Sequence, residues 1–72
     1  MLKDIEKLSM EILQIVTARF VGTGRTIPAE ILALKDETMQ IYDKSRHETD
    51  PAELEKFDKR LKEIRGQLVT GA

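Results

Sequence analysis

The 72-residue sequence contains no cysteine, no tryptophan and a single histidine. Without cysteine the chain cannot form an internal disulfide, and one histidine alone disfavours a structural zinc site. At this length only about 60% of the unfolded chain's surface becomes buried on folding, so an isolated core is marginally stable. Small domains of this kind depend on regular helix packing, on self-association, or on both. We therefore expect one domain over residues 1–72 that holds no cofactor and no metal.

The sequence also lacks an excess of charge of either sign. It has 12 basic and 13 acidic residues, which give a net charge of −1, and no segment forms a basic arm or an acidic tail. A surface that binds nucleic acid needs clustered, uncompensated Lys and Arg, because the release of counterions drives that affinity. The composition therefore disfavours nucleic acid as a partner.

Long apolar runs are missing as well. The uncharged stretch 12–18 is far shorter than a membrane-spanning helix, and acidic residues near the start stand where a signal peptide needs positive charge. These features predict a cytoplasmic protein without a membrane-bound part.

Apolar residues at helical spacing predict a first helix over residues 2–21. At 100° per residue one side of this helix carries Leu2, Ile5, Leu8, Ile12, Leu13, Val16 and Phe20. Ile15 widens the apolar arc to roughly 160°, whereas packing against a single neighbour needs only about 100°. The first helix is therefore expected to contact two neighbours and to be the central element. Gly22-Thr23-Gly24 should end it, because glycine readily adopts the left-handed conformation of a helix C-cap.

Two further helices are predicted over residues 27–45 and 51–68. Pro28 is tolerated in the first turn of the second helix, which has a main apolar face of Ile27, Ile31, Leu34, Thr38, Ile41 and Tyr42. The third helix starts with Asp50 as N-cap, Pro51 at the first helical position and Glu53 completing a capping box. It then carries a heptad stripe of Leu54, Phe57, Leu61, Ile64 and Leu68.

The short link 46–49 favours an antiparallel hairpin of the second and third helices. The predicted fold class is therefore all-α: a three-helix unit with coiled-coil-like packing, in which the long first helix lies on the hairpin. In the alternative arrangement, the first helix extends away and pairs with the first helix of a second chain.

No motif in the sequence points to catalysis. The segment 22–26 has the glycines of a phosphate-binding loop, but it lacks the preceding strand and the lysine. His47 lies in the predicted link without a recognisable nucleophile, so we interpret it as a solvated loop residue. Four acids fall on polar faces without the Glu-x-x-His pattern of a di-metal bundle and are expected to be solvated: Glu11, Asp36, Glu37 and Asp43. We expect no enzyme activity.

The residues predicted to bind a partner lie outside the main apolar faces. Leu32 and Met39, seven residues apart, form a second stripe on the second helix, and Ile15 extends the arc of the first helix. Arg19 falls inside that arc, so its charge must reach water or pair with an acid of another helix or a second subunit.

These features predict a protein-interaction or adaptor module that forms a homodimer. The alternative is a small DNA-binding regulator that uses the second and third helices like a helix-turn-helix motif. The acidic start of the third helix, Asp50 and Glu53, weighs against that alternative because it would repel phosphate.

Overall fold

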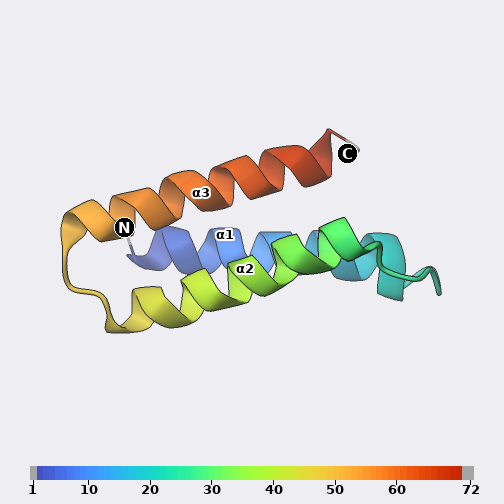
Figure 1. Ribbon diagram of the computed structural model, residues 1–72, viewed down its shortest axis with the longest axis horizontal. Coiled ribbons are helices and arrows are strands. Elements are labelled where there is room, and N and C mark those ends of the chain that lie inside the picture. The colour runs from blue at the N-terminus through green and yellow to red at the C-terminus, as the bar shows by residue number, and fades with distance from the viewer. Residues whose placement is uncertain (1, 71–72) are drawn as a thin grey trace.

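The computed structural model describes residues 2–70, which form three long helices without a strand in that range (Figure 1). They are α1 (Leu2–Val16), α2 (Ala29–His47) and α3 (Pro51–Val69), and a π-helical turn, η1 (Thr17–Val21), continues α1. The chain runs in the same direction along α1 and α3 and in the opposite direction along α2. The predicted all-α, three-helix unit with an antiparallel α2–α3 hairpin is therefore confirmed.

The first helix is the central element. It packs against both α2 and α3, and α2 also packs against α3. The core consists of Ile5, Leu8, Ile12, Val16, Ile31, Ile41, Leu61, Ile64 and Leu68. The wide apolar arc of the first helix thus covers the chain's own hairpin. Leu2 is 39% exposed, so the first residue of the predicted apolar arc does not belong to the core.

Three small polar residues also lie in the core, and the apolar pattern had placed only Thr38 among the core-facing residues. Ser9, Thr38 and Ser45 are almost completely buried. Each hydroxyl donates a 2.8 Å hydrogen bond to a backbone carbonyl of the preceding helical turn. These bonds remove the cost of burying an unpaired hydroxyl, so the three residues serve as small core side chains.

The end of the first helix differs from the expected regular α-helix. The Gly22 N–H donates to the Thr17 carbonyl at 2.7 Å, a bond that spans five residues and defines the wider π turn of η1. Gly22 itself has a helical φ of −66°. Within the segment Gly22-Thr23-Gly24, which was expected to end the helix, Gly22 is therefore not the left-handed residue.

Gly24 provides the left-handed residue, with a φ of 71°. Its N–H donates to the Val21 carbonyl at 3.2 Å, and the Arg25 N–H donates to the Phe20 carbonyl at 2.8 Å. This pair of bonds is a Schellman motif, which satisfies carbonyls at a helix end that would otherwise lack partners. Gly24 therefore terminates the helix.

The second helix starts two residues later and ends two residues later than predicted. Pro28, with ψ of 148°, is the N-cap rather than part of the first turn, and its carbonyl accepts from the Leu32 N–H at 2.9 Å. At the other end His47 is the last helical residue and is exposed, so it does not lie in the link. The connection to α3 is therefore only residues 48–50.

The start of the third helix confirms the predicted N-cap but changes the capping box. The Asp50 carboxylate accepts from the Ala52 N–H at 3.0 Å, with Pro51 in the first turn. The Asp50 N–H donates to the Glu48 carboxylate at 3.0 Å. Glu53, which should fill that role in a capping box, pairs instead with Lys56 at 3.2 Å. Glu48, which precedes the N-cap, thus takes the role that Glu53 would have in a capping box.

Candidate functional site

The second helix exposes the stripe that the sequence singled out. Leu32 is 42% exposed and Met39 is 51% exposed. Glu37 marks the side of α2 that faces α3, because its carboxylate binds Arg60. At about 100° per residue, Leu32 and Met39 lie roughly 140–160° around the helix from Glu37. They therefore face away from α3.

The first helix presents apolar groups on the corresponding side. Glu11 marks its α3 side through an ion pair with Arg65, and Met10, Leu13 and Thr17 lie roughly 100–160° around from it. Met10 is 53% exposed, whereas Leu13 is half-buried. A shallow hollow of about 310 Å³ on this side is lined by Met10, Leu13, Gln14, Thr17, Ala18 and Gly22.

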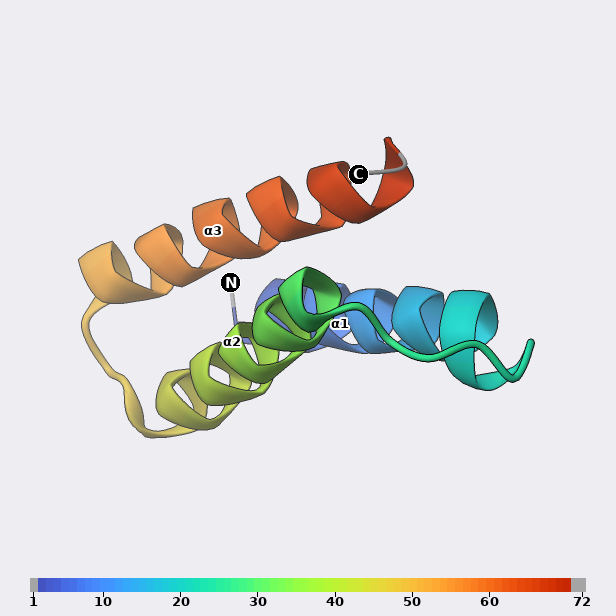
Figure 2. The same ribbon diagram turned by 45° about the vertical axis from the view of Figure 1, so that its right-hand side comes forward.

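These two sides belong to one surface. The helices α1 and α2 pack against each other, and α3 packs against both of them. The sides of α1 and α2 that point away from α3 therefore adjoin each other. In Figure 2, α1 and α2 lie together below α3. We call this surface the outer face and define it by Met10, Leu13, Thr17, Leu32 and Met39. Its apolar groups come from both helices, and its α1 half was not recognised from the sequence.

On the sides that face α3, ion pairs join α1 and α2 to α3. The Arg60 guanidinium binds both Glu37 carboxylate oxygens, with Nη2 at 2.9 Å from Oε1, and thereby joins α3 to α2. Arg65 Nη1 lies 3.0 Å from Glu11 Oε2 and joins α3 to α1. The hydrogen bond from Arg60 lowers the pKa of Glu37 below its ordinary value. The expectation that Glu11 and Glu37 are merely solvated is therefore wrong.

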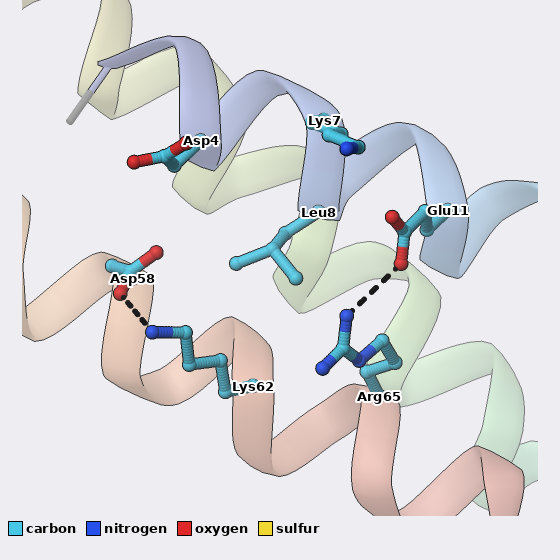
Figure 3. A pocket seen from close by; sticks show the side chains of 7 residues that line it. All are labelled: Asp4, Lys7, Leu8, Glu11, Asp58, Lys62 and Arg65. Atoms are coloured by element: carbon cyan, nitrogen blue, oxygen red, sulfur yellow. Dashed lines mark hydrogen bonds and ion pairs between the residues drawn. The ribbon is translucent and has the colours of Figure 1, made fainter.

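A second hollow, of about 350 Å³, lies between α1 and α3 (Figure 3). Leu8 and six charged side chains line it: Asp4, Lys7, Glu11, Asp58, Lys62 and Arg65. Three acids and three bases balance one another, and Lys62 pairs with Asp58 at 2.9 Å. The hollow therefore lacks the excess charge that would concentrate an ionic ligand. Within residues 2–70, no group of three or more acidic or histidine side chains could hold a metal ion.

The structure places Arg19 and Ile15 differently from Leu32 and Met39. Arg19 Nη1 donates to the Leu68 carbonyl in the last turn of α3. The last carbonyls of a helix lack intrahelical partners and attract cations, so Arg19 satisfies the end of α3 within its own chain. Ile15 is half-buried against the core. Of the four predicted partner-binding residues, only Leu32 and Met39 thus belong to the outer face.

Met10 and Leu13 were missed for identifiable reasons. The helical wheel assigned Leu13 to the core arc of the first helix, and no prediction from the sequence concerned Met10. Their spacing of three residues, with Thr17 four residues beyond Leu13, was a signal for a second stripe. It could be interpreted only once Glu11 was known to mark the side occupied by α3.

No helix within residues 2–70 is long and apolar enough to cross a lipid bilayer. Comparisons of the chain with protein-family models, with curated proteins and with solved structures found no match.

Proposed function

We propose that this chain is a small protein-interaction module that works as a homodimer through its outer face. The observation that carries this role is the joint exposure of Leu32, Met39 and Met10, on two adjacent helices. Single exposed apolar residues are common on protein surfaces, but several of them on adjoining helices are typical of a contact site.

A second copy of the chain is the partner that we propose. Within residues 2–70 the core holds nine buried apolar residues, so the fold gains from additional burial, and the sequence offers neither a disulfide nor a zinc site. Most soluble oligomers contain identical subunits related by a two-fold axis. The absence of cysteine is compatible with the reducing cytoplasm, where we propose that the protein acts.

The alternative role, DNA binding through α2 and α3, has less support. A recognition helix approaches the phosphate backbone with its first turn. Around the start of α3 lie Glu48, Asp50 and Glu53, with Glu48 and Asp50 bound to backbone N–H groups. Negative charge at this position opposes contact with phosphate.

Sedimentation equilibrium at tens of micromolar protein tests the proposed function. The wild-type chain should have the mass of a dimer, and the variant Leu32→Glu/Met39→Glu should have the mass of a monomer while keeping a helical circular dichroism spectrum. Val69→Glu is the matched control, because Val69 is 68% exposed at the end of α3 and lies outside the outer face. It should remain a dimer. A monomeric wild-type chain would overturn the homodimer.

A further inference from the structure

The exposed stripe of α2 separates charges of opposite sign. Relative to Leu32 and Met39, Lys35 and Arg46 lie roughly 30–50° to one side, which we call the basic flank. At the same angles on the other side lie Asp36 and Asp43, the acidic flank. The stripe is thus an apolar seam with a basic edge and an acidic edge.

These charges have no ionic partner within residues 2–70. Lys35, Asp36 and Asp43 take part in none of the ion pairs of the described chain. The Arg46 guanidinium also forms no ion pair there and lies 5.9 Å from the centre of the Tyr42 ring. By contrast, Glu37 on the α3 side of the same helix is paired. The seam therefore presents its charges to whatever packs against it.

The sign pattern selects one direction for a symmetric partner. When two identical helices pair in parallel about a two-fold axis that runs along them, each acidic flank meets the partner's basic flank. When they pair in antiparallel fashion, the two acidic flanks meet, and so do the two basic flanks. Charges beside an apolar seam set the orientation of paired helices in this way. Parallel pairing is therefore the complementary arrangement for α2.

We propose that a second copy of this chain docks with its α2 parallel to α2, seam against seam. This inference rests on the proposed function. It adds which helix forms the dimer contact, in which direction the two helices run, and in which register they pair. Leu32 packs against the partner's Leu32, and Met39 packs against the partner's Met39. Asp36 faces the partner's Lys35, and Asp43 faces the partner's Arg46.

Cysteine cross-linking reads this register directly, because the natural sequence contains no cysteine. A disulfide requires Cα atoms within about 7 Å of each other, whereas seven helical residues span about 10 Å. Leu32→Cys and Met39→Cys should each form a disulfide-linked dimer under mild oxidation. An equimolar mixture should give 32–32 and 39–39 links and almost no 32–39 link, as identified by mass spectrometry. Val69→Cys is the control and should stay largely unlinked.

Charge variants test the pairing of the flanks. Lys35→Glu places acid against the partner's Asp36, and Asp36→Lys places base against the partner's Lys35. Each should weaken the dimer about tenfold, whereas Lys35→Glu/Asp36→Lys should restore it. Antiparallel helices would leave the affinity of all three variants unchanged, because their like charges already face one another.

The outcomes separate this inference from the proposed function. Links between positions 32 and 39 alone would overturn parallel pairing and indicate antiparallel pairing. A dimer in sedimentation equilibrium without links at either position would place the interface elsewhere and also overturn the inference, while the homodimer itself would stand. A monomer in sedimentation equilibrium would overturn both the parallel pairing and the homodimer.

Discussion

Two apolar pairs with identical spacing have opposite environments in this molecule. On α3, Leu61 and Leu68 are seven residues apart and fully buried. On α2, Leu32 and Met39 are also seven residues apart, and each exposes between two fifths and a little over half of its surface. Spacing by seven predicts a stripe that can pack against another helix. The identity of the helix that covers it depends on the rest of the fold.

The surroundings of the two stripes extend the comparison. The α3 stripe lies against α1 and α2, and the ion pairs of Arg60 and Arg65 tie α3 to both neighbours. The α2 stripe has charges on both sides as well, but within residues 2–70 they form no ion pairs. The α2 stripe therefore resembles one half of a helix–helix interface that no helix within residues 2–70 covers. This resemblance is the basis of the homodimer that we propose.

The sharpest test of this contrast is truncation of one leucine from each stripe. Leu61→Ala should lower the free energy of unfolding by about 2–5 kcal/mol, because it removes buried methyl groups and leaves a cavity. Leu32→Ala should change it by only about 0.5 kcal/mol in dilute protein, where the chain is a monomer. Urea denaturation measures both. Equal losses would show that the two stripes do not differ as described.

The start of α3 gives the next largest effect, because it anchors the buried stripe. Asp50→Ala should cost about 0.5–2 kcal/mol through loss of the hydrogen bond to the Ala52 N–H. Glu53→Gln should cost less, since Glu53 does not bond back to the Asp50 N–H, and chemical denaturation of both variants measures the difference. A larger loss for Glu53→Gln would indicate that the capping box predicted from the sequence forms after all.

Gly66 offers a way to strengthen the helix that carries the buried stripe. It lies within α3, and a Cβ added there would meet no atom within 4 Å. Gly66→Ala should therefore raise the free energy of unfolding by about 0.4–1 kcal/mol, because alanine loses less conformational entropy on folding. Thermal denaturation should show a higher melting temperature with an unchanged dimer mass. A lower melting temperature would mean that this part of α3 is not a regular helix.

Loss of the ion pair between Glu37 and Arg60, on the α3 side of α2, should have the smallest effect on stability. Glu37→Gln should cost about 0.2–1 kcal/mol at neutral pH, because the Glu37–Arg60 pair is more than a third exposed. The pKa of Glu37 is lowered by folding, so its contribution is complete above the ordinary value near 4.5. It is lost as the pH falls through the lowered pKa of the folded state.

Urea denaturation of the wild type and Glu37→Gln at neutral and acidic pH should therefore give stabilities that converge in acid. Glu55→Gln, at an exposed position of α3, serves as the control and should change stability less. Because Glu37 faces α3, the dimer mass of Glu37→Gln should not change. A dimer that dissociates in this variant would place the contact on the wrong side of α2.

Local sequence signals were sufficient to predict much of the fold. The spacing of apolar residues predicted the three helices, Asp50-Pro51 predicted the start of α3, and the wide arc of the first helix predicted two neighbours. Each of these features depends on residues that are near one another in the chain. The segment Gly22-Thr23-Gly24 ends the helix as predicted, but the π turn that precedes it was not predicted.

The candidate site was only half predictable for a different reason. A helical wheel shows that Leu32 and Met39 share a side, but it does not show which helix lies beside that side. Glu11, Glu37 and Arg19 gained their partners from helices distant in sequence, and these contacts depend on the order of the helices around the core. The α1 half of the outer face became recognisable only when that order was known.

The most direct test of the central claim, that a second chain covers the outer face, is the melting temperature at several protein concentrations. Association stabilises the folded chain by mass action, so each tenfold increase in concentration should raise the wild-type melting temperature by about 3–6 °C. Leu32→Glu/Met39→Glu should melt at one temperature at every concentration. A wild-type melting temperature that does not change with concentration would contradict the claim.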